Sequence, residues 1–199
     1  MGGYFMILFR VINKDEYDEL FKGIPRSVTT SRYSNPSKNY NSFNYYDGIN
    51  YMHFFKFAEH ARKYMYKFGN RIIMCDIPDD IIDQFGYGSY PYYDNENISI
   101  PVPEYVIKRD DFDTDYIVKD RPKKIECIQY INGVNAFTIY NQILEKIYND
   151  FNEKHEIFDR QLYVRAAVNY LLSNDIDFLL YWYSSRDNKK DLKVLQRNR

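Results

Sequence analysis

The sequence predicts an α+β fold followed by a helical C-terminal region. Short β-prone apolar runs alternate with helical patterns up to residue 131, whereas apolar residues beyond it recur at helical spacing. Of the 199 residues, 45% are hydrophobic and 19% aromatic, which is enough to form a core. We therefore expect an α+β domain over residues 1–131 and a helical region over residues 132–199 packed on it.

The first strand and helix are predicted from an apolar run and two helix-end signals. Residues 4–12 are apolar and β-prone, and they include Arg10. Asn13, followed three positions later by Glu16, has the pattern of a capping box, and Gly23 is a typical helix stop. A strand should therefore lead directly into a short helix.

A long polar segment, residues 25–48, separates this pair from the next elements. Residues 51–55 predict an aromatic strand, and the apolar positions of residues 57–68 recur at helical spacing. Gly69 predicts a left-handed helix end, and residues 71–77 predict another strand.

The following stretch combines a helical turn, a loop and a strand. Residues 79–85 predict the turn, and the glycines and tyrosines of residues 86–93 predict a loop in which the backbone can approach a ligand closely. Glu104 then lies on a strand. Residues 110–124 are charged and predict a connector, and residues 125–131 predict one more strand.

Three helices are predicted after this strand. They cover residues 136–152, 159–172 and 176–183, each from apolar positions at helical spacing. The last is apolar almost throughout, so we expect it to be buried against the rest of the chain.

Charge and cysteine content restrict the classes of partner and compartment. The chain has 27 basic and 28 acidic residues, so it has no excess positive charge to attract a phosphate backbone, and nucleic acid is an unlikely partner. Cys75 and Cys127 lie in apolar runs, which is typical of free, buried thiols. With no signal-like leader and no apolar run of about 20 residues, we expect a cytoplasmic protein without a membrane span.

Two charged residues on predicted strands are the main candidates for chemistry. A guanidinium at Arg10 fits a pair of phosphates, and its alternative is a half-exposed strand residue paired with a carboxylate. Glu104, set among prolines and apolar residues, is suited to stabilising a developing cation, and its alternative is an ordinary solvent-facing glutamate.

The aromatic strand and the polar loop supply the other candidates. His53 can donate to a substrate oxygen or act as an acid or base, or it is a hydrogen-bonded core residue. Tyr51, Phe54 or Phe55 can stack on a flat heterocycle. Thr30 can orient a sugar or nicotinamide, or cap a turn. The remaining histidines have no metal-ligand spacing, and we expect no metal.

Taken in order, these residues resemble the ADP-ribosyltransferase-like family of compact bacterial and phage NAD-using domains. The likeness rests on Arg10 in Leu-Phe-Arg-Val, on the Tyr-Met-His-Phe-Phe-Lys run from Tyr51, and on Glu104 in Pro-Glu-Tyr-Val-Ile. It covers residues 4–108, and the family's Ser-Thr-Ser strand and second acid have no close counterpart.

The resemblance implies a mixed, mostly antiparallel β core and a role for each of these residues. Arg10 would bind the NAD pyrophosphate, and an aromatic residue between Tyr51 and Phe55 would hold nicotinamide. Glu104 would bond the ribose hydroxyl as nicotinamide leaves. Because position 102 is Val and not a second acid, the resemblance disfavours arginine as the acceptor and leaves the macromolecular target open.

Two functions therefore stay open, with a third disfavoured. The first is NAD-dependent ADP-ribosylation of a macromolecular, most simply protein, target in a bacterial toxin, defence or phage counter-defence setting. The second is a non-catalytic inhibitor or immunity module that binds a protein through an acidic, tyrosine-rich surface. A ribonuclease using His53 with Arg10 or Lys56 is disfavoured by the neutral charge.

Overall fold

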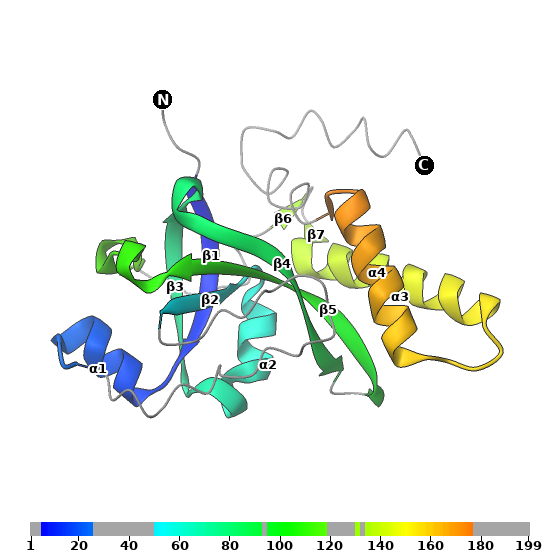
Figure 1. Cartoon of the computed structure of the whole chain (residues 1–199), viewed down its shortest axis with the longest axis horizontal. Coiled ribbons are helices and arrows are strands. Elements are labelled where there is room, and N and C mark those ends of the chain that lie inside the picture. Colours follow the sequence, from blue (N-terminus) through cyan, green and yellow to red (C-terminus); the bar gives the residue numbers. More distant parts are fainter. Residues whose placement is uncertain (1–4, 26–49, 93–94, 119–129, 132–133, 177–199) are drawn as a thin grey trace. The chain divides into compact units, whose positions relative to one another are not determined.

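The structure, a computed structural model, has an α+β fold, which confirms the fold class predicted from the sequence (Figure 1). The chain forms two compact units. The first unit comprises Met1–Gly88 and Val102–Arg121, and the second comprises Ser89–Pro101 and Pro122–Arg199. The division runs through the two longest strands. The residues that the structure describes are 5–25, 50–92, 95–118, 130–131 and 134–176.

The first two elements begin and end where local signals place them. Strand β1 (Phe5–Ile12) leads into helix α1 (Lys14–Lys22). The Asn13 side chain accepts a hydrogen bond of 2.9 Å from the backbone N–H of Glu16. Gly23 ends the helix with a φ of 65°, a left-handed conformation that glycine adopts without strain.

Five strands form one sheet in the order β3-β1-β2-β5-β4 (Figure 1). Strand β1 pairs antiparallel with β2 and β3, and β2 pairs antiparallel with β5, which confirms the expected antiparallel character of the core. The other strands are β2 (Tyr51–Phe55), β3 (Arg71–Pro78), β4 (Ile82–Tyr92) and β5 (Asn95–Lys108).

The predicted glycine and tyrosine loop is wrong, because residues 86–92 belong to β4. The helical turn before it shortens to a 3-10 helix, η2 (Asp79–Ile81). Packing explains the difference: the ring of Phe85 lies 4.8 Å from that of Tyr105 on β5, and Tyr87 is buried beside Phe85. These cross-strand aromatic contacts favour strand over loop.

Helix α2 (Ala58–Phe68) packs on the sheet, with Tyr64 stacked at 5.4 Å on Phe55 of β2. The predicted left-handed end of this helix is wrong, because Gly69 has a φ of 166°, an extended conformation. Glycine is needed here for space instead. A Cβ at Gly69 would lie 2.1 Å from the backbone oxygen of Ile12, so the chain after α2 passes directly against the end of β1.

The charged segment after β5 returns to the edge of the sheet. It contains two 3-10 helices, η3 (Arg109–Asp111) and η4 (Thr114–Tyr116), and the backbone N–H of Val118 donates to the carbonyl of Met74 on β3 at 2.9 Å. Cys75 on β3 is a buried thiol and not half of a disulfide, as expected. Cys127 lies outside the described residues.

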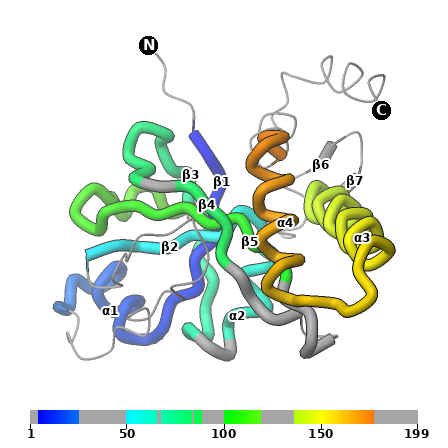
Figure 2. The backbone as a smooth tube through the Cα atoms, turned by 45° about the vertical axis from the view of Figure 1, so that its right-hand side comes forward, coloured from blue at the N-terminus to red at the C-terminus, as the bar shows by residue number. Residues whose placement is uncertain are grey.

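The described helices of the second unit are α3 (Ala136–Lys154) and α4 (Arg160–Ser173), which lie side by side (Figure 2). Two short strands, β6 (Tyr130–Ile131) and β7 (Val134–Asn135), precede them. Both predicted helices are confirmed. Asp159 caps α4, and the Tyr140 hydroxyl donates at 2.7 Å to the carbonyl of Pro101 on β5. Residues 125–129 and 177–183, for which we expect strand and helix, lie outside the described residues.

Candidate functional site

The strand registers place the expected site residues on two different faces of the sheet. Phe9 lies opposite Phe55, and Phe55 lies opposite Glu104, so these three side chains share one face. His53, two residues before Phe55, is on the face of Glu104, whereas Arg10, the neighbour of Phe9, is on the other face. The structure therefore brings the side chains of His53 and Glu104 together and separates both from the guanidinium of Arg10.

Arg10 is fully buried, and its guanidinium is directed at Glu16 of α1. Its Nε and Nη2 lie 2.8 and 2.7 Å from Oε1 of Glu16, and its Nη1 donates at 2.7 Å to the backbone carbonyl of His53. A phosphate would have to displace Glu16 to bind the same fork. Arg10 is thus paired with a carboxylate, although it is buried rather than half-exposed, and its contact with a pyrophosphate stays a prediction.

Arg109, directly after β5, extends this ionic network. Its Nη1 lies 3.1 Å from Oε2 of Glu19, and its Nη2 lies 3.5 Å from Oε1 of Glu16. Two arginines and two glutamates balance their charges, which is the condition for burying ions at tolerable cost. The sequence pattern predicts a capping role for Glu16 and does not predict its ion pair with Arg10. The missed signal is Arg10 itself, because a guanidinium within an apolar strand needs a carboxylate nearby.

His53 on β2 and Glu104 on β5 form the most suggestive pair of titratable groups. His53 Nδ1 lies 3.8 Å from Glu104 Oε2, and the two side chains are 11% and 5% exposed. This distance exceeds that of a hydrogen bond, so the contact is electrostatic when the ring is protonated. Paired strands hold both groups rigidly. Together they offer a carboxylate for a developing positive charge and an imidazole for hydrogen bonding or proton transfer.

Of the other predicted site residues, Tyr51 shares the face of His53 and Glu104, whereas Phe54 lies on the opposite face. Tyr51 is half-buried at the start of β2. Phe54 is fully buried, with the guanidinium carbon of Arg10 5.7 Å from its ring centroid and the Phe112 ring centroid at 5.8 Å. These contacts already occupy Phe54, so a heterocycle cannot stack there without rearrangement. Thr30 lies outside the described residues.

Lys56 is a buried lysine whose charge acts on the carboxyl of Asp79. Lys56 is 1% exposed, and its Nζ lies 5.7 Å from the ring centroid of Tyr105. Burial raises the pKa of Asp79, whereas the charge of Lys56 acts to lower it. The available signal was the position of Lys56 within an apolar run at the end of β2.

The described residues also bear on metal binding and on membrane insertion. Within that part of the chain, His, Cys, Asp and Glu side chains do not gather in groups of three or more that could hold a metal ion. Helices in the same residues are too short or too polar to cross a membrane. Comparison of the whole chain with protein-family models, with curated proteins and with solved structures gave no match.

Proposed function

We propose that this chain is an NAD-dependent ADP-ribosyltransferase that modifies a macromolecular target, with Glu104 and His53 as its reacting groups. The observation that carries the proposal is the 3.8 Å approach of His53 Nδ1 to Glu104 Oε2 across two paired strands. The order of motifs that resembles the ADP-ribosyltransferase-like family supports it. A toxin, defence or counter-defence setting stays a prediction.

The proposed reaction needs a carboxylate beside the ribose of NAD, and we assign this role to Glu104. The bond between nicotinamide and ribose breaks with its electron pair going to nicotinamide, which leaves positive charge on the ribose carbon. The Glu104 carboxylate stabilises that charge and accepts a hydrogen bond from a ribose hydroxyl. The acceptor atom then bonds to the ribose carbon and loses a proton, which His53 is placed to take.

Arg10 has a positioning role in this proposal. Its Nη1 binds the carbonyl of His53, so it fixes the strand that carries the imidazole. Because His53 and Glu104 are both largely buried, NAD has to displace covering side chains to reach them. The binding of NAD should therefore be measured separately from the transfer of ADP-ribose.

The test compares the wild type with Glu104→Gln, which keeps the shape of the side chain and removes its charge. Calorimetry with NAD should give heat for both proteins. Transfer of label from NAD to a cell extract should fall by about 10²-fold or more in Glu104→Gln, the size of effect seen when a charge-stabilising group is lost. The matched control is Glu59→Gln on α2, which should label as the wild type does. Equal labelling by Glu104→Gln, or no heat with NAD, would exclude the proposal.

A second variant separates the two possible roles of Arg10. If Arg10 positions His53, then Arg10→Lys should change the Kd for NAD by less than about tenfold while lowering stability. A pyrophosphate contact predicts instead a larger rise in Kd in a protein that remains folded.

A non-catalytic protein-binding module is the second candidate, favoured by the acidic surface of the first unit. One of its aspartates, Asp83, lies 3.7 Å from the Nζ of Lys108. Replacing the η3 and η4 aspartates by Asn should weaken capture of a basic protein without added NAD. The exposed aspartates of this surface are Asp79, Asp80, Asp83, Asp110, Asp111, Asp113 and Asp115.

A further inference from the structure

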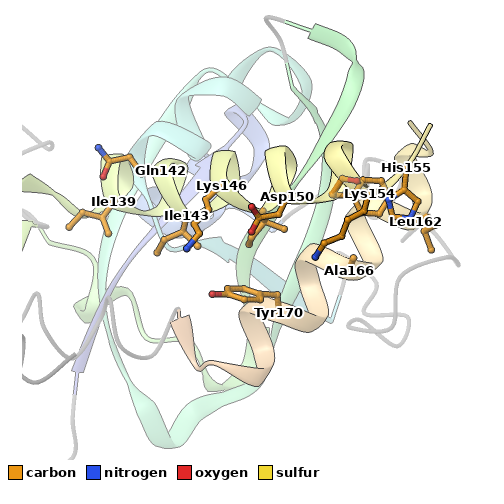
Figure 3. A pocket seen from close by; sticks show the side chains of 12 residues that line it. Ile139, Gln142, Ile143, Lys146, Asp150, Lys154, His155, Leu162, Ala166 and Tyr170 are labelled. Atoms are coloured by element: carbon orange, nitrogen blue, oxygen red, sulfur yellow. Dashed lines mark hydrogen bonds between the residues drawn. The ribbon is translucent and has the colours of Figure 1, made fainter. Parts of the chain in front are cut away.

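A groove between α3 and α4 in the second unit has no part in the proposed reaction. It has a volume of about 730 Å³, and side chains from both helices line it (Figure 3). All of its lining residues belong to the second unit. The apolar lining residues are Ile139, Ile143, Ile147, Phe151, Leu162 and Ala166.

Helix α4 has an exposed apolar stripe in addition to its buried apolar face. Its inward face is already buried through Tyr163, Ala167 and Leu171. Leu162 and Tyr170 face the groove from the other side and are 46% and 44% exposed. A surface helix normally has a single apolar stripe, so this second, exposed stripe is suited to contact with a partner.

The facing side of α3 has the same periodicity. Ile139, Ile143 and Ile147 are four residues apart and half-buried, like the spacing of Leu162 and Ala166 on α4. Two apolar stripes along neighbouring helices form the shape that accepts a third helix. From Ile139 to Ile147 the stripe is about 12 Å long at a rise of about 1.5 Å per residue.

The rim of the groove is mainly positive. Lys146 and Lys154 of α3 line it and are exposed, and Asp150 between them is the one acidic residue among its lining residues. The described length of α4, Arg160–Ser173, contains no acidic residue. A partner with carboxylates beside its apolar stripe would match this rim.

We propose that the α3–α4 groove binds an amphipathic helix of a partner protein, with an apolar stripe flanked by Glu or Asp. The apolar residues of that helix contact the isoleucine stripe of α3 and the stripe of α4 that contains Leu162 and Ala166. Its carboxylates pair with Lys146 and Lys154. Helix-in-groove recognition supplies the affinity through apolar burial, and the charges set orientation and specificity.

The test uses the full chain and two labelled synthetic helical peptides. Both carry leucines at positions i, i+3, i+4 and i+7, and they differ only in flanking Glu or flanking Lys. Fluorescence anisotropy should show the Glu peptide binding at least about tenfold more tightly than the Lys peptide. Lys146→Glu combined with Lys154→Glu should reverse this order.

A matched pair of variants on α4 locates the binding surface. Leu162 and Leu172 are 46% and 42% exposed leucines of the same helix, but only Leu162 lines the groove. Leu162→Glu should weaken the Glu peptide by about tenfold or more, and Leu172→Glu should leave its Kd unchanged.

Four results would overturn the proposal. The first is equal binding of the two peptides, and the second is an equal effect of Leu162→Glu and Leu172→Glu. The third is a concentration-dependent mass that Leu162→Glu abolishes, which would assign the groove to a second copy of this chain. The fourth is a loss of stability in Leu162→Glu alone without any peptide, which would mean that this chain fills its own groove.

Discussion

Arg10 on β1 and Glu16 on α1 form a buried ion pair, with Nη2 of the arginine 2.7 Å from Oε1 of the glutamate. The two side chains are 0% and 3% exposed. Both charges are removed from water, so loss of one member of the pair costs more than it would at the surface. The pair joins the first strand to the helix that follows it and, through Arg10 Nη1, to the carbonyl of His53 on β2.

Glu16→Gln should therefore lower the free energy of unfolding by about 3–5 kcal/mol, the cost of leaving a buried charge without its counterion. Urea denaturation measures this change. The control is Glu19→Gln, since Glu19 is 27% exposed and contacts Arg109 at the rim of the same network. This control should cost about 0–1 kcal/mol. Similar losses in both variants would show that the Arg10–Glu16 pair is not the buried centre of the network.

Two glycines at helix ends should respond differently to substitution. At Gly69 a Cβ would meet the Ile12 carbonyl at 2.1 Å, so Gly69→Ala should cost about 1–3 kcal/mol or more through overpacking against backbone. At Gly23 the space is open but φ is 65°, so Gly23→Ala should cost about 1–2 kcal/mol through backbone strain.

Asparagine distinguishes the two causes, because it adopts the left-handed conformation more readily than alanine. Gly23→Asn should recover part of the stability lost in Gly23→Ala, as measured by thermal unfolding. Gly69→Asn should be no better than Gly69→Ala. Recovery at Gly69 would show that conformation, and not the contact with Ile12, requires glycine there.

Local chemistry explains which parts of the fold could be predicted from the sequence. The bounds of α1 follow from Asn13 and Gly23, whose roles depend on backbone groups a few residues away. Within β4, residues 86–92 are predicted as loop because Gly86, Gly88, Ser89 and Pro91 are of the types common in turns. The contact of Phe85 with Tyr105, 20 positions along the chain, decides its structure, and no local pattern reports it.

The candidate site could be predicted only in part for a related reason. The sequence identifies Arg10, His53 and Glu104 as charged groups within strands, but their faces depend on register. A shift of one residue moves every side chain of a strand to the other face. The pairing of Phe9 with Phe55 and of Phe55 with Glu104 thus places Arg10 on the other face of the sheet from the His53–Glu104 pair.

In the second unit, the hydroxyl of Tyr140 should contribute measurably to stability. It donates at 2.7 Å to the carbonyl of Pro101, and both residues are buried. Tyr140→Phe leaves that carbonyl without this donor and should cost about 1–3 kcal/mol, seen as faster hydrogen exchange of α3 amides. Tyr170→Phe on the 44% exposed face of α4 is the control and should change stability by less than about 0.5 kcal/mol. Equal exchange in the two variants would contradict a role for the Tyr140 hydroxyl.

The buried imidazole of His60 on α2 should make the protein sensitive to acid. Burial, and secondarily the charge of Lys63, lowers the pKa of His60 from 6.5 to about 3. Between these two values the unfolded chain binds a proton that the folded chain does not, so stability falls as pH falls from 6.5 towards 3. The slope approaches about 1.4 kcal/mol per pH unit for one proton. His60→Leu removes this proton uptake, so its urea midpoint should depend less on pH than that of the wild type between pH 6 and about 4. The same pH dependence in both proteins would show that another group causes the acid sensitivity.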